Sequence, residues 1–319
     1  MVVGLAGRAV ARAVVAQGAR YGGVLRQGDH DGRRVWGGTQ QPGGMATPSA
    51  AAPGAAAPGP VRALQADLAA VGTYLGTLDG AFGPGTAKAV RLFQWNAANQ
   101  AQRLLRGQLV GAVAPLRPAG MTPTGIVDAA TARQLGLWVL GGLHTTGDLV
   151  RVAASGFANV QLGGGFRRIA HAGVGAGDVV MARPLLADLR AMDVEAGRLG
   201  MTLNLNQALR IAGAPVSGAV VTPARKSQHL LGHALDLNMI DGTSWNTAAD
   251  FRAGNETENA KTFIATMKAN GMRWGGDFRK ADTPHFDREL PSGSEVWDYK
   301  YFFNQRSISQ VQPLARETA

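Results

Sequence analysis

The sequence contains no cysteine, which excludes disulfide frameworks, thiolate metal sites and cysteine nucleophiles. It also lacks an uncharged apolar run near the ~20 residues that a membrane-spanning helix requires. The longest such run, Leu135 to Leu143, is far too short. Charged residues make up only 17% of the chain, whereas hydrophobic residues make up 45%. That balance excludes a wholly disordered chain and supplies enough apolar side chains for packed cores.

The 319 residues are enough for two domains at roughly 150 residues per domain. The net charge of +10 indicates a polyanionic partner, for which nucleic acid, anionic lipid and an anionic cell wall all qualify. Charge alone does not choose between them. Because no Gly-rich phosphate loop and no recognisable nucleic-acid module is present, we expect no nucleic-acid partner.

Residues 1–60 differ from the rest of the chain. The stretch from Val2 to Ala16 could form a short helix, but Arg8 and Arg12 interrupt the apolar run that a cleavable signal peptide needs. Six Arg and two Asp precede position 41, and residues 41–60 are uncharged and rich in Pro, Gly and Ala. We therefore expect a basic leader that touches anionic envelope surfaces, followed by a flexible linker.

Helical periodicity begins at Val61, and a turn-rich loop over residues 79–86 follows, ending in Thr86 as an expected N-cap. The next helix is expected from about Ala87. The spacing then repeats, because the pattern G-x-F-G-x-x-T from Gly80 is answered by G-x-V-D-x-x-T from Gly125. The two halves are predicted to be structurally equivalent.

This stretch resembles a peptidoglycan-binding domain of the three-helix type. The matching positions are Leu64-Gln65, Gly72, Tyr74, Gly76, Asp79-Gly80, Phe82-Gly83, Thr86, Ala89-Val90, Phe93-Gln94, Gly125, Asp128 and Thr131. The likeness covers residues 61–137 and departs from the family between Asn96 and Thr124, where an insertion lengthens the connection. It implies an all-α wall-binding domain over residues 61–140, with bacterial peptidoglycan as partner. The residues it implies for wall binding are Tyr74, Asp79, Phe82 and Gln94.

Residues 141–176 are interpreted as a connection, and residues 177–319 as a second domain. Apolar periodicity predicts helices over residues 180–199 and 250–271, with shorter segments suited to strands between and after them. This pattern favours a small α+β domain, so that the chain as a whole is α+β. The aromatic tail over residues 297–303 is expected to pack back onto this domain.

Histidines and acids cluster over residues 227–238 and again over residues 274–286. Imidazole and carboxylate are the zinc ligands that do not need a thiol. His229 and His233 would share a helical face, but the glutamate of a His-Glu-x-x-His protease is missing between them. The alternation after Gly232 instead predicts a strand that turns Asp236 away from His233. Pairing of His229 with Asp236 is therefore favoured.

The two clusters resemble the M15 family of zinc peptidases, which cut peptidoglycan stem peptides. The pattern S-x-H-x-x-G-x-A-x-D from Ser227 fits the first motif, and D-x-x-H from Asp282, after the Trp-Gly-Gly-Asp run at 274–277, fits the second. The resemblance implies His229, Asp236 and His285 as ligands of one zinc ion per chain, and Asp282 as general base. Arg210 is expected to stabilise the oxyanion, with Arg225 as competitor. Ser227 either supports a ligand by a hydrogen bond or caps the turn.

These resemblances together imply a modular peptidoglycan hydrolase whose wall-binding domain raises the local concentration of a zinc peptidase. The bond expected to be cut joins L-alanine to D-glutamate, as in phage endolysins, and D-alanyl-D-alanine carboxypeptidase activity is the alternative. A non-catalytic wall-binding protein is the alternative from a different class. We expect a monomer that is made in the bacterial cytoplasm and acts in the periplasm or cell wall after holin-type release.

Overall fold

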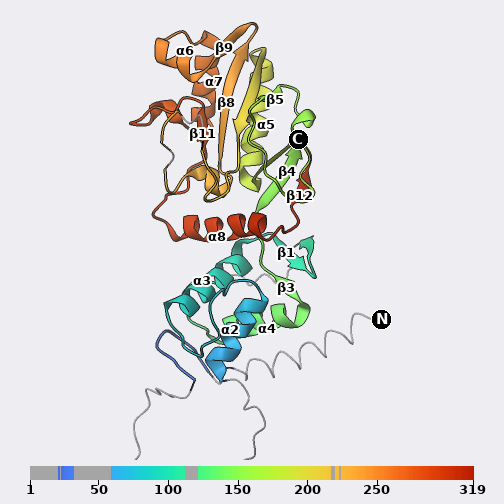
Figure 1. Ribbon diagram of the computed structural model, residues 1–319, viewed down its shortest axis with the longest axis vertical. Helices are drawn as coiled ribbons and strands as arrows, with labels where there is room; N and C mark the ends of the chain where they lie inside the picture. Colours follow the sequence, from blue (N-terminus) through green and yellow to red (C-terminus); the bar gives the residue numbers. More distant parts are fainter. Residues whose placement is uncertain (1–20, 22, 32–58, 112–120, 217–219, 223) are drawn as a thin grey trace, which may run out of the picture. The chain divides into compact units, whose positions relative to one another are not determined.

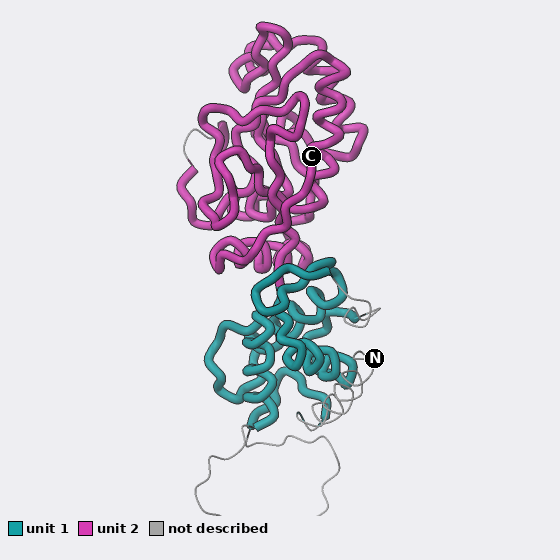
Figure 2. The backbone as a smooth tube through the Cα atoms, turned by 90° about the vertical axis from the view of Figure 1, so that its right-hand side faces the viewer, with its two compact units in different colours: residues 1–145 teal, residues 146–319 magenta. Residues whose placement is uncertain are grey.

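The computed structural model describes residues 21, 23–31, 59–111, 121–216, 220–222 and 224–319. They fall into two compact units, residues 1–145 (unit 1) and 146–319 (unit 2), shown separately in Figure 2. The expected leader helix at residues 2–16 and nearly all of the expected linker lie outside the described residues. Within the described ranges, no helix is long and apolar enough to cross a membrane.

Unit 1 packs three helices around one apolar core and adds a small antiparallel sheet in the order β2-β1-β3 (Figure 1). The elements are α2 (Pro60–Ala70), α3 (Pro84–Asn99), β1 (Gln102–Leu105), β2 (Gln108–Gly111), α4 (Ala129–Gly141) and β3 (Leu143–His144). The three-helix fold expected from the sequence is therefore present. The β1–β2 hairpin lies in the insertion, so unit 1 is not purely helical.

The internal repeat is confirmed, and a buried glutamine organises each copy. In the first copy, Gln65 accepts a hydrogen bond from the N–H of Gly80 (2.9 Å) and donates to Thr86 Oγ1 (3.2 Å). In the second copy, Gln94 accepts from the N–H of Gly125 (2.9 Å) and donates to Thr131 Oγ1 (3.0 Å). Each glutamine also donates to the carbonyl that follows the glycine. The two loops thus have equivalent supports.

The helix starts differ from those expected. Thr86 does not cap α3, because the helix already begins at Pro84, whose fixed φ suits the first helical position. The Thr86 hydroxyl instead donates to the carbonyl of Ala81 (3.1 Å). Helix α4, which follows the second repeat loop, is capped by Asp128, whose carboxylate accepts from the N–H of Thr131 (2.7 Å). The threonines shared by the repeat therefore support the loops rather than cap the helices.

Part of the expected leader is an integral piece of unit 1. Tyr21 and Leu25 are buried in its core, and the phenol of Tyr21 bonds the Asp67 carboxylate. Residues 25–31 hydrogen-bond with both repeat loops through backbone groups. The Asp31 carboxylate accepts from two N–H groups at the start of α2, where a helix favours negative charge. The buried side chains of Tyr21 and Leu25 and the capping carboxylate of Asp31 therefore attach this segment to unit 1, whereas its composition had predicted a leader without such contacts.

Unit 2 has two sheets and four α-helices in its described residues. The elements up to the first motif are β4 (Leu149–Ala153), η3 (Ala154–Gly156), β5 (Val160–Leu162), β6 (Asp178–Ala182), α5 (Arg183–Arg198), β7 (Met201–Gln207) and η4 (Gln228–Leu231). The remainder are β8 (Ala234–Asp241), β9 (Ser244–Asn246), α6 (Ala248–Ala253), α7 (Glu258–Ala269), β10 (Arg273–Trp274), η5 (Gly275–Asp277), β11 (His285–Asp287), α8 (Glu295–Ser309) and β12 (Ala315–Glu317). The large sheet runs β10-β11-β8-β7-β5, with β9 beside β8, and the small sheet runs β12-β4-β6.

Three expectations about this unit are corrected. Residues 141–176 are not a simple connection, because β4 pairs with β6 and β5 pairs with β7 inside unit 2. The helix expected from residue 180 begins at Arg183, since the apolar run before it is strand β6. The helix expected over 250–271 is two helices, because Gly254 ends α6 in the left-handed conformation (φ 73°) and Thr257 caps α7.

The large sheet separates a helical core from the face that carries the functional residues. Helices α5 and α7 pack against one face, where Leu203, Leu237 and Phe286 are buried among them (Figure 1). Because side chains alternate along a strand, Asp236 and His285 belong to the opposite face. The aromatic tail forms α8, with Trp297 and Phe303 buried as expected. The predicted α+β class is confirmed.

Candidate metal centre and active site

The first motif is a short helical turn followed by a strand. The Ser227 hydroxyl accepts from the N–H of His229 (3.3 Å), so Ser227 caps η4 rather than supporting an imidazole. Gly232 then reverses the chain at φ 75°, and a Cβ there would lie 2.7 Å from the Ala182 nitrogen. Glycine is therefore required at this turn. Strand β8 follows immediately and carries Asp236 on the face predicted from the alternation.

Three side chains predicted as metal ligands converge on one point. Asp236 and His285 are direct partners in the register of β8 and β11, and His229 lies on the turn before β8. Asp236 Oδ1 lies 3.0 Å from His229 Nε2 and 3.1 Å from His285 Nδ1, and the two nitrogens are 3.1 Å apart. The three ligand atoms lie within 4.8 Å of one another. His233 is not part of this group.

The remaining ring nitrogens of the two histidines test whether this group suits a metal ion. His229 Nδ1 donates to the Ala208 carbonyl (2.6 Å), and His285 Nε2 donates to Asp287 Oδ2 (3.0 Å). With these protons held outward, His229 Nε2 and His285 Nδ1 are the nitrogens that face Asp236, and each can present a lone pair to a metal ion that displaces its proton. Two imidazoles and one carboxylate form a donor set that Zn²⁺ accepts, with one position left for water. The residues therefore fit the metal.

Asp287 and Arg273, which our sequence reasoning missed, support His285 from behind. Arg273 forms a two-point ion pair with the Asp287 carboxylate (2.7 and 2.8 Å). Although burial alone lowers the pKa of His285, its hydrogen bonds to Asp236 and Asp287 raise that pKa to about 9. Burial alone raises the pKa of Asp236, but the two histidines hold it well below its usual range. Asp287 lies two residues after His285, so the period of a strand could have revealed it.

Asp282 lies beside the metal site on a loop that Gly275 holds. Its N–H donates to the Gly275 carbonyl (2.8 Å), and its own carbonyl accepts from the N–H of His285 (2.9 Å). A Cβ on Gly275 would lie 2.1 Å from the backbone carbonyl oxygen of Asp282, so the loop requires glycine there. Trp274 pins the far side of the loop by donating to the Thr283 carbonyl (2.8 Å).

The Asp282 side chain is a half-buried carboxylate that lines the cleft. It has no hydrogen bond or ion pair among the residues that the structure describes, so it does not cap the turn. Burial, reinforced by the charge of Asp236, raises the pKa of Asp282 above its ordinary value. An unpaired carboxylate with a raised pKa is suited to accept a proton and release it again.

Arg210 lies at the same site, and Arg225 does not. Arg210 is 8% exposed, follows β7, and donates its backbone N–H to the carbonyl of ligand His229 (2.9 Å). Burial lowers the pKa of its guanidinium, which nonetheless remains a cation. Arg225 is exposed and lies outside the cleft lining.

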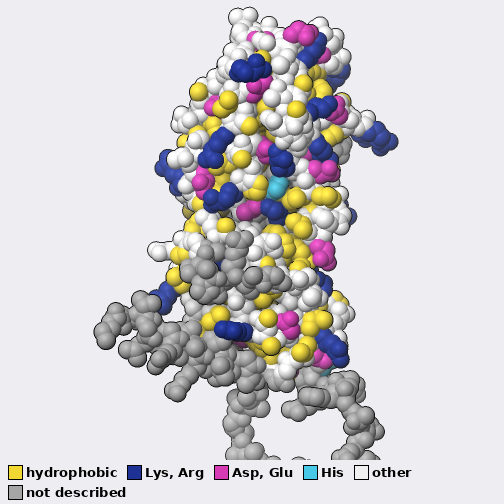
Figure 3. Space-filling model, turned by 180° about the vertical axis from the view of Figure 1, so that it is seen from behind, with side chains coloured by type: hydrophobic (Ala, Val, Ile, Leu, Met, Phe, Trp, Pro, Cys, Tyr) yellow, Lys and Arg dark blue, Asp and Glu magenta, His cyan; other side chains and the backbone are white. Residues whose placement is uncertain are grey.

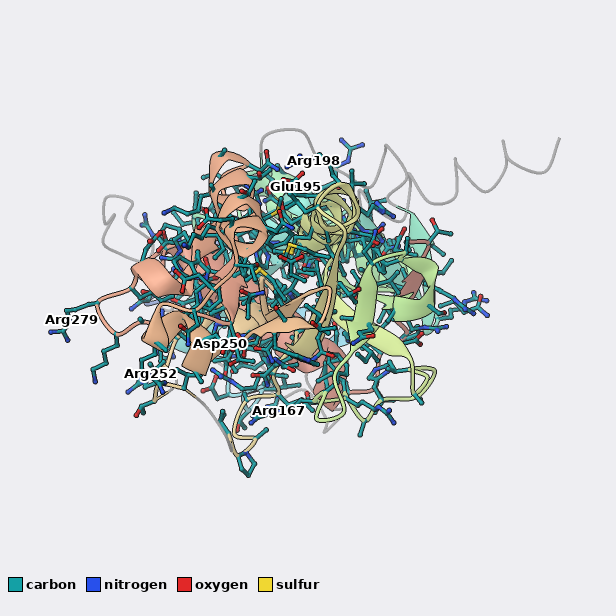
Figure 4. The ribbon with its side chains drawn as sticks, turned by 90° about the horizontal axis from the view of Figure 1, so that it is seen from above. Arg167, Glu195, Arg198, Asp250, Arg252 and Arg279 are labelled. Atoms are coloured by element: carbon teal, nitrogen blue, oxygen red, sulfur yellow. The ribbon has the colours of Figure 1, made fainter. Side chains whose placement is uncertain are left out.

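The candidate ligands, Asp282 and Arg210 all line one cleft of about 650 Å³ in unit 2. The cleft is also lined by Arg167, Asn206, Arg273 and Glu289. In Figure 4, Arg167 lies on the opposite side of unit 2 from Glu195 and Arg198 of α5. The cleft therefore belongs to the sheet face that α5 leaves free.

The four wall-binding residues expected in unit 1 divide into two kinds. Phe82 and Gln94 are buried, so they hold the core and the second loop, and the expectation that they face the wall is corrected. Asp79 is exposed, but its carboxylate accepts from Gln65 (2.7 Å) and from the N–H of Ala81 (2.9 Å). Tyr74 is half-buried and donates to the Thr77 carbonyl (2.7 Å). Of the four, Tyr74 and Asp79 remain accessible to a ligand.

Comparison with known families agrees with this geometry in both units. Residues 221–288 match the M15 peptidase family described as D-alanyl-D-alanine carboxypeptidase, a range that contains all three candidate ligands and Asp282. Residues 58–99 match the family described as a peptidoglycan binding domain, a range that contains the first repeat loop. The chain therefore carries an M15 metallopeptidase domain, with His229, Asp236 and His285 as its metal site, together with a peptidoglycan-binding domain, and is a hydrolase of peptidoglycan peptides.

Proposed function

We propose that the enzyme is a zinc-dependent endopeptidase that cuts the bond between L-alanine and D-glutamate in the peptidoglycan stem. The observation that carries this proposal is the unpaired Asp282 carboxylate beside the His229–Asp236–His285 group in one cleft. The Trp-Gly-Gly-Asp run before Asp282 supports the endopeptidase branch through its resemblance to those enzymes. Zn²⁺ bound by the three ligands would supply a Lewis acid that activates water and polarises the scissile carbonyl.

The protein's own residues account for the proton and charge movements of amide hydrolysis. Asp282 takes a proton from the attacking water, whose oxygen bonds to the carbonyl carbon. The same carboxyl group then gives this proton to the nitrogen as the carbon–nitrogen bond breaks, so the products are a carboxylic acid and an amine. Arg210 stabilises the negative charge that develops on the carbonyl oxygen. The Asp287–Arg273 pair holds His285 in the tautomer that leaves Nδ1 free.

D-alanyl-D-alanine carboxypeptidase activity is the second candidate, because the matching family carries that description. The same ligands and the same proton path would serve it. Purified stem peptides ending in D-alanyl-D-alanine distinguish the two activities by mass spectrometry. A new amino-terminal D-glutamate supports the endopeptidase, whereas loss of one D-alanine supports the carboxypeptidase.

We further propose that unit 1 holds the enzyme on the wall and that the role is lytic, as in a phage endolysin released from the cytoplasm through holin pores. Figure 3 shows basic side chains scattered among acidic ones on the face seen there, a distribution suited to loose attraction to an anionic envelope. Co-expression with and without a holin in bacteria tests this role. Lysis only with the holin is expected, and lysis without it would refute the release route.

A further inference from the structure

Two of the four basic side chains that line the cleft already have acidic partners. Lys226 pairs with Asp298 (2.7 Å) and also donates to a backbone carbonyl. Arg273 pairs with Asp287 and with Glu289 (2.8 Å). The charges of Lys226 and Arg273 are therefore balanced within the protein.

The other two, Arg167 and Arg210, have no such partner. Among the residues that the structure describes, neither guanidinium has a hydrogen bond or an ion pair. Their charges lie within electrostatic range, since burial and, less strongly, the charge of Arg167 lower the pKa of Arg210, while the charge of Asp236 raises it. Asp236, which is hydrogen-bonded to His229 and His285, balances part of the Arg210 charge, whereas the half-buried Arg167 has no acidic partner among the described residues. The positive charge of the cleft therefore favours a ligand that carries a negatively charged group.

The backbone fixes both arginines relative to the metal site. The N–H of Arg167 donates to the Asn206 carbonyl (3.0 Å), and Gly163 donates to the Leu205 carbonyl (2.7 Å), which ties this loop to the end of β7. Arg210 is tied to the carbonyl of His229. Arg167 therefore lines the same cleft as the ligands and Arg210, on the side of unit 2 opposite Glu195 and Arg198 (Figure 4).

The proposed substrates place a carboxylate close to this position. In the L-alanine–D-glutamate bond, D-glutamate continues the stem through its γ-carboxyl group, so its α-carboxylate is free and lies one carbon from the scissile nitrogen. In D-alanyl-D-alanine, the terminal carboxylate occupies the same place. Arg binds a carboxylate through two parallel N–H groups, whereas a carboxamide presents its own N–H donors to them.

We propose that Arg167 binds the α-carboxylate of the leaving-side residue and so selects stem peptides in which this group is free over those in which it is amidated. This inference rests on the proposed function and assigns a specificity-determining role to a residue outside the matched range 221–288. Arg210 remains the group that meets the reacting carbonyl.

The test uses two synthetic stem peptides that differ only in carboxylate or carboxamide at the α-position of D-glutamate. The zinc-loaded full chain is expected to cleave the carboxylate peptide with kcat/KM about 10- to 100-fold higher, the range expected for one charge-assisted contact. Arg167→Gln should remove most of this preference, mainly through KM, and Arg167→Lys should keep part of it. Arg168→Gln is the matched control, because Arg168 is adjacent, exposed and outside the cleft lining.

Binding of both peptides to the Asp282→Asn variant, measured by calorimetry, gives the preference without turnover. Tighter binding of the carboxylate peptide that is lost with Arg167→Gln supports the inference even if neither peptide is cut, an outcome that would refute the proposed function alone. Equal cleavage and equal binding of the two peptides would overturn the inference while leaving the hydrolase intact. An equal loss of preference in Arg167→Gln and Arg168→Gln would also overturn it.

Discussion

We expect His233 to make the stability of unit 2 depend on pH. It lies between η4 and β8, is 3% exposed, and neither ring nitrogen has a hydrogen-bond partner among the described residues. Its backbone is fixed, since its N–H donates to the Gln228 carbonyl and its carbonyl accepts from Arg288. The half-buried ion pair of Lys300 with Asp148 lies within electrostatic range of the ring.

Burial, reinforced by the positive charge of Lys300, lowers the pKa of His233 to about 4. In the unfolded chain the same side chain has an ordinary pKa near 6.5. Below pH 6.5 the unfolded chain therefore binds a proton that the folded chain refuses. The stabilisation is complete above pH 6.5 and is lost as the pH falls toward 4. The difference between the pKa values of His233 in the folded and unfolded chains corresponds to about 3 kcal/mol in the free energy of unfolding, because each unit of pKa is equivalent to about 1.4 kcal/mol.

The assay measures the free energy of unfolding in urea at several pH values between 4 and 7 for the wild type, His233→Gln and His233→Leu. A chelator is present throughout, so the ligand histidines titrate alike in all three proteins. From pH 7 to pH 4 the wild type should lose about 3 kcal/mol more than either variant. Stability curves that run parallel over this range, for variants that fold, would refute the reasoning.

Three further changes test the supports of the site and the fold. Asp287→Asn should weaken zinc binding about 10- to 100-fold, because it removes the carboxylate that orients His285; competition with a chromophoric chelator measures this. Gly275→Ala should lower kcat and weaken zinc binding, since the added methyl lies 2.1 Å from the Asp282 carbonyl oxygen and 2.8 Å from Cβ of the ligand His285; metal analysis beside the activity assay measures the two effects separately. Gln65→Leu should lower the free energy of unfolding by about 3 kcal/mol, because it leaves the buried N–H of Gly80 unpaired. Thermal unfolding measures this loss, and an unchanged melting temperature would show that the glutamine is dispensable.

The parts of the site that lie close together in sequence could be predicted from it. Alternation after Gly232 correctly separated Asp236 from His233, and the repeat spacing correctly predicted two equivalent loops. Both predictions rest on local periods, namely two residues for a strand and a fixed spacing from glycine to threonine. The convergence of His285 with Asp236 came from family resemblance, and the register of β8 with β11 supplies its physical basis.

The parts that depend on contacts between distant segments could not be predicted. Tyr21 and Leu25 are two apolar residues in a stretch with many arginines, and only the core that they enter shows that they belong to unit 1. Phe82 and Gln94 occupy family positions, but their burial decides that they support the fold. Arg167 carries no motif, and its importance arises because a loop tied to β7 brings it to the cleft.

The most direct test of the central claim is digestion of purified peptidoglycan by the zinc-loaded full chain, with and without chelator, analysed by mass spectrometry. We predict new amino-terminal D-glutamate ends that disappear with chelator and with Asp282→Asn. Intact stem peptides in zinc-supplemented buffer, with the protein bound to the walls, would contradict the account and leave a wall-binding protein without peptidase activity.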